Sequence, residues 1–379
     1  RLLVAYVLGG IVARGANPLL PRVVYETLLV DCCRMAPRAV PSAMARALGM
    51  LVRTPGLLSP VGADRLAAWF ALHLCTFDLR WAWAQWEDLL SLEVDESSLA
   101  TLPARLFVRA TLARLLALSY MDRVRPTLPD AFQAALAASA SVSSLGDASP
   151  SVSACVALAE RRADASELSA AAGGSWAVLF EALLRVGTAS PGRLQHLLER
   201  YGRAVRASVP AECVPAALDM LAAALFGPAF AMALHYVLTN RVFVPAAVLP
   251  WLARQLGDPV RMARLGLPLL VLELVSHTSA LPDHAASRAV ADGPDAAAFA
   301  RAIETMRAEH VSGVRALRIA LAAAASEGGA PVAALVARDV LAELAVLPAA
   351  AAEAAVVRQA EVSAAVPSVS ADVLSLFPV

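Results

Sequence analysis

Residues 64–90, DRLAAWFALHLCTFDLRWAWAQWEDLL, hold four of the six tryptophans in a chain of 379 residues. Apolar side chains from Leu66 to Phe77 recur at three- and four-residue spacing, which is typical of the buried face of a helix. After Arg80, three tryptophans follow at spacings of two and three. This spacing predicts a turn and then the entry of another helix, whose next turn should bury Leu89 and Leu90.

Proline divides much of the remaining chain into segments of one helix length. Five prolines fall every 14 to 19 residues, at positions 191, 210, 228, 245 and 259, and each precedes or opens an apolar-periodic run. Runs of β-branched residues are short, and alanine and leucine dominate. The sequence therefore predicts an all-α fold, an α-α superhelix of HEAT-like helical hairpin repeats arranged as two stacked domains.

Charge and hydropathy limit the partners that the chain can have. The chain has 32 acidic and 32 basic residues, so no overall positive field attracts nucleic acid. Residues 220–238 carry no acidic or basic charge, but Gly227 and Pro228 interrupt them, which predicts two helices, about 215–226 and 229–240, and no membrane span. Five cysteines, an odd number, do not form a disulfide framework and indicate a reducing compartment, the cytosol or the nucleus.

Several enzyme classes need residues that this chain lacks. It contains no lysine, which P-loop enzymes, pyridoxal enzymes and protein kinases all require. It has no CxxC pair and no HExxH motif for zinc, and the HxxE pair of His196 and Glu199 is typical of a solvated helix face. We therefore expect that the protein is not an enzyme and that it binds no metal and no cofactor.

Three segments carry a resemblance to a known family. Residues 64–90 contain an aromatic WF, a histidine and then F-x-x-RW-x-W-x-x-W followed by an acidic residue. Residues 24–37 (VYETLLVDCCRMAP) and 105–132 (RLFVRATLARLLALSYMDRVRPTLPDAF) add conserved-looking spacings of tyrosine, leucine, proline and arginine. Together they resemble the large subunit of the nuclear cap-binding complex, in its second and third domains, which are similar to the middle domain of translation initiation factor 4G.

The resemblance implies a function and partners. In that family the large subunit is a non-catalytic scaffold that orders a small RNA-recognition-motif subunit, and this partner holds the 7-methylguanosine mRNA cap. Capped RNA would thus be bound indirectly. Further partners would be RNA-processing, export and nonsense-mediated decay factors, and the location would be the nucleus, with shuttling to the cytoplasm. The alternative is a general helical-repeat adaptor or transport protein without a role at the cap.

The tryptophan cluster allows two interpretations. Stacked aromatic rings with a nearby carboxylate could read a methylated guanine, and Trp81, Trp86, Glu87 and Asp88 are suitable residue types. Helical spacing instead favours burial, and the resemblance assigns the cap to the small subunit. We therefore expect the structural core to include Trp69, Phe70, Trp83 and Trp86. We predict a partner interface at Arg80, Trp81, Tyr120, Asp122, Arg123 and Arg125.

The domain boundary is expected near the end of the LSY segment. Residues 1–122 would form the first domain, which looks truncated at its N-terminus, and residues 123–379 the second. A flexible connection is expected near 276–294, where Pro, Gly, Asp and His interrupt the apolar periodicity. The alanine-rich tail from Ala320 is expected to be helical except for its last residues.

Overall fold

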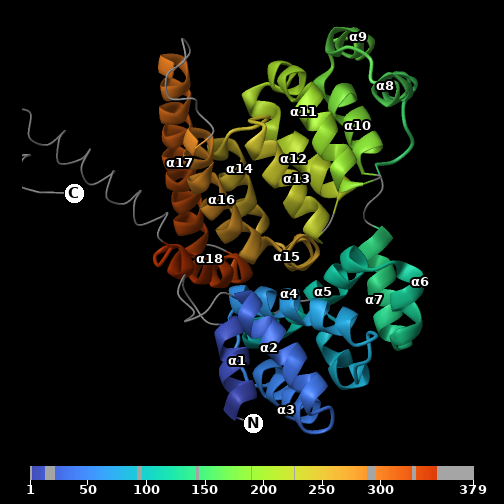
Figure 1. Ribbon diagram of the computed structural model, residues 1–379, viewed down its shortest axis with the longest axis vertical. Helices are drawn as coiled ribbons and strands as arrows, with labels where there is room; N and C mark the ends of the chain where they lie inside the picture. The colour runs from blue at the N-terminus through green and yellow to red at the C-terminus, as the bar shows by residue number, and fades with distance from the viewer. Residues whose placement is uncertain are drawn as a thin grey trace, which may run out of the picture.

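The computed structural model describes residues 2–12, 22–91, 96–141, 145–188, 190–225, 227–287, 296–326 and 330–347. Within these ranges every regular element is a helix and none is a strand, so the all-α prediction is confirmed. The first part of the chain forms α1 (Leu2–Val12), α2 (Arg22–Met35), α3 (Ala39–Arg53), α4 (Pro60–Thr76), η1 (Trp83–Leu89), η2 (Glu96–Thr101), α5 (Leu102–Leu118), α6 (Met121–Val124), η3 (Arg125–Thr127) and α7 (Asp130–Ser141). These helices lie in the lower half of Figure 1.

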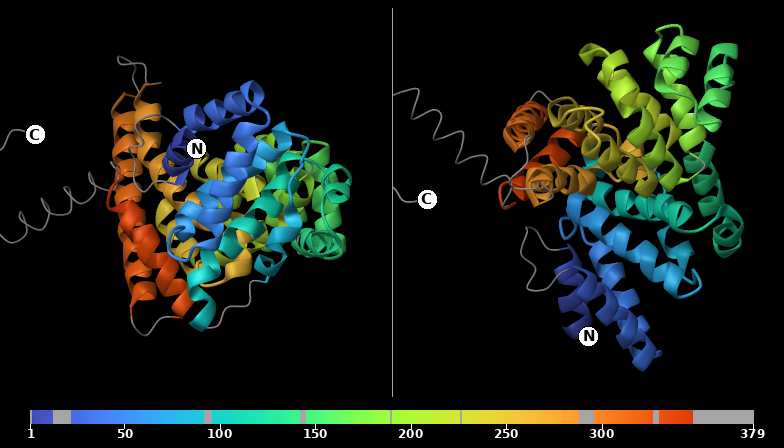
Figure 2. Two further views of the ribbon diagram at one scale, coloured as in Figure 1. Left: turned by 90° about the horizontal axis from the view of Figure 1, so that it is seen from below. Right: turned by 45° about the horizontal axis from the view of Figure 1, so that its top comes forward.

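The second part of the chain forms the upper half of Figure 1. It consists of α8 (Pro150–Glu160), α9 (Ala165–Ala171), α10 (Trp176–Gly187), α11 (Pro191–Ser208), η4 (Ala211–Cys213), α12 (Val214–Ala224), α13 (Gly227–Thr239), α14 (Pro245–Gln255), α15 (Pro259–Leu265), α16 (Leu267–Ser287), α17 (Ala296–Ala325) and α18 (Pro331–Leu344). Most helices pack mainly on helices one to three places away along the chain, as in a helical-repeat superhelix, whereas α15 packs mainly on α5. Figure 2 shows these layers from two further directions.

Local sequence explains where many of these helices begin. Proline occupies the first turn of α4, α8, α11, α14 and α15, where its missing N–H would have no helical partner. The hydroxyls of Ser59, Ser149 and Ser190 accept hydrogen bonds from the backbone N–H three residues on, which caps α4, α8 and α11. The prolines that divide the sequence therefore mark the starts of helices in the structure.

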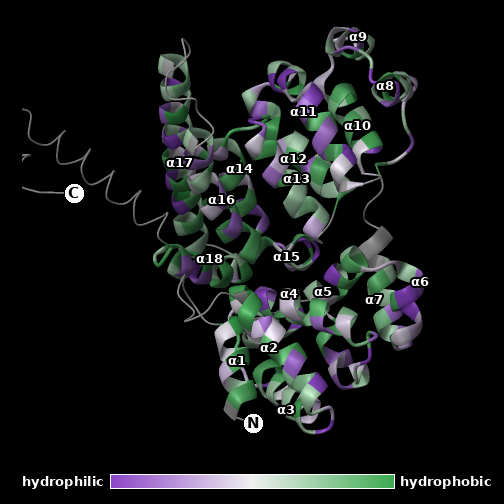
Figure 3. Ribbon diagram, viewed as in Figure 1, coloured by the Kyte–Doolittle hydropathy of each residue, from purple (hydrophilic) through white to green (hydrophobic). Residues whose placement is uncertain are grey.

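The pair α4 and α5 lies at the junction of the two halves. The two helices pack closely on each other, and between them they contact α1, α2 and α3 on one side and α13, α15, α16 and α18 on the other. Both helices are buried along most of their length, and apolar residues predominate in them, as the colours of Figure 3 show. One hydrophobic core therefore runs from α1 through this pair to α18.

The structure differs from the sequence prediction at the connection near 276–294. Helix α16 continues to Ser287, so residues 276–287 are helical, and the rest of that segment lies outside the described residues. The hydroxyls of Ser276 and Thr278 find acceptors within the helix, the carbonyls of Leu272 and Leu274 one turn back. Thr278 and Pro282 are buried, so packing sustains the helix across a segment without clear periodicity.

The predicted boundary at residue 122 stays a prediction. Helix α7, which follows that position, packs on α5 and η1 of the first part. The tail after Leu347 lies outside the described residues, while the stretch from Ala320 to Leu344 is helical in α17 and α18.

The apolar segment around Gly227 forms two helices, as the sequence predicts. Helix α12 ends at Ala224 and α13 begins at Gly227, whose φ of 51° is in the left-handed region that glycine adopts readily. In the part of the chain that the structure describes, no single helix is long and apolar enough to cross a membrane. Two helix pairs reach that length together, but they bend by 115° between α11 and α12 and by 55° between α15 and α16.

Candidate functional site

The tryptophan segment folds into an aromatic cluster around Phe70. The structure places Trp69, Phe70, Trp83 and Trp86 in the interior, each with 2% or less of its surface exposed. The ring of Phe70 has its centroid 5.7 Å from that of Trp86, 6.2 Å from that of Trp83 and 5.6 Å from that of Phe107. Most of these rings meet edge to face, the arrangement that packed aromatic side chains favour. The four residues therefore act as a core that joins α4, η1 and α5.

The cluster leaves no slot for a stacked base between Trp81 and Trp86. Their ring centroids are 5.2 Å apart, whereas a base held between two rings needs about 7 Å, twice the usual carbon contact distance. Asp88, a candidate carboxylate for the guanine edge, instead binds Arg53 of α3, with 2.8 Å between its Oδ1 and Nη2. Its pKa is lowered by this hydrogen bond. The geometry therefore disfavours direct cap reading by these residues.

A strained turn connects α4 to the aromatic 3₁₀-helix η1. Asp78 and Leu79 have φ values of 54° and 60°, in the left-handed region that residues with a Cβ rarely adopt. Leu79 is buried, and its backbone N–H donates to the carbonyl of Leu74 over 2.7 Å. Arg53 also donates to the carbonyl of Gln85 and so ties η1 to α3. Sequence reasoning predicted a turn here but not its left-handed backbone, because neither residue is glycine or asparagine.

The predicted partner interface lies on the surface. Arg80, Tyr120, Asp122, Arg123 and Arg125 are exposed, and Trp81 is half-buried against Phe70. Arg80 follows the end of α4, and the other exposed residues follow the end of α5.

An electrostatic effect between Cys75 and Arg123 indicates that the end of α4 lies near the segment after α5. Burial raises the pKa of the Cys75 thiol, and the nearby positive charge of Arg123 opposes that rise. Arg125 is held by Gln133 of α7, with 3.2 Å between its Nε and the amide oxygen. Cys75, near the end of α4, therefore lies close to Arg123 of α6.

A set of buried charged contacts, which the sequence analysis missed, joins α4 to the C-terminal part of the chain. Glu343 of α18 accepts two hydrogen bonds of 2.9 Å from Arg65. Asp339 accepts a bond of 2.8 Å from the backbone N–H of Val61, in the first turn of α4. Since the N-terminal N–H groups of a helix have no helical acceptors, Asp339 acts as a distant cap. Helix α18 is thereby fixed to the first half of the molecule.

A second charged contact lies deeper in the same junction. The carboxylate of Asp64 in α4 pairs with Arg114 of α5 at 2.6 Å. Its other oxygen accepts from the backbone N–H of Leu269 in α16 over 3.1 Å. Asp64 and Arg114 are both buried, so each charge depends on the other for stabilisation. The partners are at least 50 residues apart in sequence, and no local motif signals them.

His73 lies within this half of the molecule, between Trp69 and Phe77. Its ring centroid is 5.2 Å from that of Trp69 and 4.7 Å from that of Phe77. The side chain is almost fully buried, and burial lowers its pKa to about 4. His73 is therefore neutral at pH 7 and serves as a packed aromatic side chain.

We expect the protein to lose stability when the pH falls from 7 to 4. Because the folded pKa of His73 is depressed to about 4, the unfolded chain takes up a proton near pH 6.5 while the folded chain does not, and this penalty levels off below pH 4. The contribution of His73 at pH 4 is at most about 3 kcal/mol. Urea midpoints measured from pH 7 to pH 4 should fall less steeply for His73→Phe than for the unaltered protein.

The matched control for this prediction is His196→Phe. The side chain of His196 on α11 is 81% exposed, so its replacement should leave the pH dependence unchanged. Equal acid slopes for His73→Phe and the unaltered protein would contradict the assignment.

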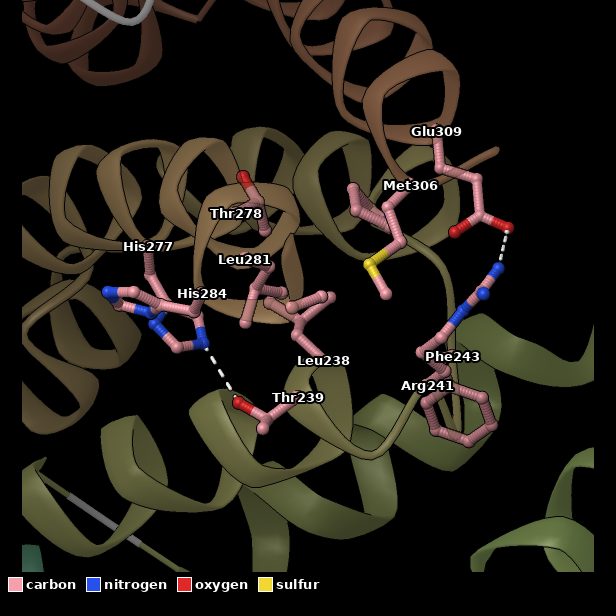
Figure 4. Close-up of a pocket in the computed structure, with 12 residues that line it drawn as sticks. Leu238, Thr239, Arg241, Phe243, His277, Thr278, Leu281, His284, Met306 and Glu309 are labelled. Carbon is pink, nitrogen blue, oxygen red and sulfur yellow. Dashed lines mark hydrogen bonds and ion pairs between the residues drawn. The ribbon is translucent and has the colours of Figure 1, made fainter. Parts of the chain in front are cut away.

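A small cavity of about 220 Å³ lies where α13 meets α16 and α17. Figure 4 shows Leu238, Leu281 and Met306 in its middle and polar side chains at its two ends. At one end, His277 and Thr239 form a hydrogen bond of 3.0 Å, and at the other Arg241 pairs with Glu309 at 2.7 Å. The first pair holds α16 to the end of α13, and the second holds α17 to the connection between α13 and α14.

Burial of His277 keeps this end of the cavity uncharged. Its pKa is lowered to about 4, first by burial and then by the neighbouring His235 and His284. The ring of His235 stands nearly perpendicular to that of His277, with centroids 4.3 Å apart. Within the described residues, no group of three or more His, Cys, Asp or Glu side chains could hold a metal ion.

Comparison with known proteins identifies the first part of the chain. Residues 1–130 match the family model described as MIF4G like. Nuclear cap-binding protein subunit 1 of Xenopus tropicalis is 37% identical over 136 residues, which are 36% of this chain and 16% of that protein. The subunit of the same name from Homo sapiens is 34% identical over 112 residues, 30% of this chain and 13% of that protein. That from Salmo salar is 34% identical over 110 residues, 29% of this chain and 13% of that protein.

The matched stretch thus spans about one sixth or less of the length of these relatives. The family model covers α1 to the start of α7, and so includes the aromatic cluster, the strained turn and the predicted interface. The resemblance that the tryptophan segment indicates is therefore confirmed: residues 1–130 match the MIF4G like family model, and this chain is similar to nuclear cap-binding protein subunit 1.

Proposed function

We propose that this chain is a non-catalytic scaffold of a nuclear cap-binding complex, which binds and orders a small RNA-recognition-motif subunit. The observation that carries this proposal is the match of residues 1–130 to the MIF4G like family together with cap-binding relatives. Those relatives are named as nuclear cap-binding subunits, which supports a nuclear location. On this proposal the 7-methylguanosine cap is held by the small subunit.

The geometry of the aromatic cluster supports cap binding by the small subunit rather than by this chain. Trp86 is buried against Phe70, and Asp88 is engaged by Arg53, so the arrangement disfavours cap binding by these groups. The exposed residues at the ends of α4 and α5 remain accessible to a partner protein. We assign them, with Arg123 and Arg125 as the central charges, to the surface that contacts the small subunit.

The superhelix supplies further surfaces for the other proposed partners. The outer faces of its helices are polar and its overall charge is zero, which suits selective protein contacts better than general RNA binding. RNA-processing, export and decay factors are the proposed partners of these faces. Shuttling to the cytoplasm belongs to the same proposal.

We expect the isolated chain not to be retained on a 7-methylguanosine matrix at physiological salt. Retention should appear when the small RNA-recognition-motif subunit is added, because the scaffold reduces the entropy that the small subunit loses on closing around the cap. Cap affinity measured by fluorescence should be higher for the mixture than for the small subunit alone. Arg123→Glu/Arg125→Glu should weaken complex formation, whereas Arg301→Glu/Arg315→Glu, at exposed positions of α17, should not.

The outcomes of this experiment separate the alternatives. Cap binding by the isolated chain as strong as that of the mixture would show that the chain itself reads the cap. Failure to form a complex with the small subunit would favour a general helical-repeat adaptor. If both double variants weakened complex formation equally, Arg123 and Arg125 would not belong to the interface.

A further inference from the structure

A groove lined by arginines lies between the α8–α9 turn and α11, far along the chain from the matched domain. Its volume is about 740 Å³, and its lining comes from the end of α8, the turn that follows it, α10 and α11, which lie near the top of Figure 1. The charged side chains that line it are Glu160, Arg162, Arg193, His196, Glu199 and Arg200. From the sequence alone, residues such as His196, Glu199 and Arg200 are expected on a solvated helix face. In the folded chain they line a groove.

Two of the guanidinium groups in this groove are free to bind a ligand. Among the described residues, the side chain of Arg162 has no hydrogen bond or ion pair. Arg193 has one ion pair, to Glu160 at 3.8 Å, which is longer than a hydrogen bond. Arginine offers five N–H donors in a planar arrangement that fits a carboxylate with two parallel bonds. The groove therefore has unused donors for an anionic ligand.

Of the two acidic residues of the groove, Glu160 faces Arg193 in the long ion pair, and Glu199 is held within α11. Glu199 accepts a hydrogen bond of 2.8 Å from Gln195 and lies 3.4 Å from His196 on the same helix. Arg200 is used structurally, because its Nη2 donates to the carbonyl of Arg162 over 2.6 Å. This bond fixes the turn that presents Arg162.

The backbone of Arg162 is unusual. Its φ of 59° is in the left-handed region, where a residue with a Cβ is strained and glycine or asparagine is preferred. The chain nevertheless carries a long cationic side chain at this position, next to Arg161. This backbone closes α8, because the N–H of Ala163 donates to the carbonyl of Leu158 over 3.0 Å, and the turn holds Arg162 at the edge of the groove.

The floor of the groove distinguishes a peptide from a nucleic acid. Ala159, Val186 and Leu197 make part of its lining apolar. The aromatic residue of the lining, Tyr201, is fully buried and donates its hydroxyl to the carbonyl of Ala163 over 2.7 Å, so its ring is not available to stack on a base. We propose that this groove binds an acidic peptide segment of a partner protein, with Arg162 and Arg193 pairing its carboxylates. This inference does not depend on the proposed role at the cap.

The test uses the full chain and three labelled probes in fluorescence anisotropy. The peptide EEELEEE should bind saturably, and QQQLQQQ should bind at least tenfold more weakly. Arg162→Asn and Arg193→Gln should each weaken binding of EEELEEE at least fivefold. Arg254→Gln, an exposed arginine of α14 away from the groove, should not change it. Arg162→Asn should also keep or raise the melting temperature, since asparagine tolerates a left-handed backbone.

Two results would overturn the proposal. Equal affinities for EEELEEE in the groove variants and in Arg254→Gln would show that the peptide binds elsewhere or by net charge alone. Binding of the third probe, an oligouridylate with the same number of charges, as tightly as EEELEEE would assign the groove to phosphates. Neither result bears on the small subunit, so this test fails or succeeds separately from the cap experiment.

Discussion

Replacement of Glu343 with alanine should destabilise the attachment of α18 to α4 by about 3–5 kcal/mol, because it leaves a buried arginine without the carboxylate that it pairs with. The side chain of Glu343 is 1% exposed and that of Arg65 14% exposed, so solvent compensates little for the lost charge. Hydrogen exchange of the α18 amides should accelerate roughly a hundredfold or more. The midpoint of urea unfolding should fall as well.

Two further variants make this prediction specific. The double replacement Arg65→Met/Glu343→Leu removes both charges and should recover most of the lost stability, since apolar pairs often replace buried ion pairs without cost. Glu304→Ala removes a carboxylate that is 70% exposed on α17 and should have little effect. Unchanged exchange of α18 in Glu343→Ala would show that the pair does not hold this helix.

Trp86→Ala should lower the free energy of unfolding by about 3–5 kcal/mol, because it opens a cavity at the centre of the aromatic cluster. Trp86 is 1% exposed and its ring meets Phe70, Trp83 and Phe107 within 6.1 Å between centroids. Trp86→Phe should cost less, since it keeps one aromatic ring in the site. The measurement is the urea midpoint of each variant.

Tyr120→Ala serves as the control for the tryptophan variants. Tyr120 is 66% exposed and should contribute little to folding, although we place it in the partner interface. An unchanged midpoint for Trp86→Ala would mean that the ring is accessible, and the stacking interpretation of the cluster would have to be restored.

The features of the fold that could be predicted from sequence are those set by local chemistry. Proline in the first turn and serine at the cap determine where α8 and α11 begin, and both signals are visible in the sequence. The three-to-four spacing of apolar residues around Phe70 likewise identifies a buried helix face. Glycine at position 227 breaks an apolar run because its backbone reaches a left-handed φ.

The features that could not be predicted depend on tertiary structure. Asp339 and Glu343 look like ordinary residues of an amphipathic helix until α18 is placed against α4. The left-handed backbones of Leu79 and Arg162 contradict residue preference, because backbone hydrogen bonds at the ends of α4 and α8 override it. The helical extension of α16 past residue 276 rests on burial of Thr278 beneath α17, which periodicity in one sequence does not reveal.

The contact between Asp339 and Val61 also has a consequence for synthesis on the ribosome. The two residues are separated by 278 positions, and at 5–20 residues per second the ribosome needs roughly 15 to 60 seconds to make that length of chain. During this interval the first turn of α4 and the guanidinium of Arg65 have left the ribosome without their carboxylate partners. The face of α4 that α18 covers is therefore open during this interval, and it is during translation, rather than in the finished protein, that this face is most accessible to chaperones.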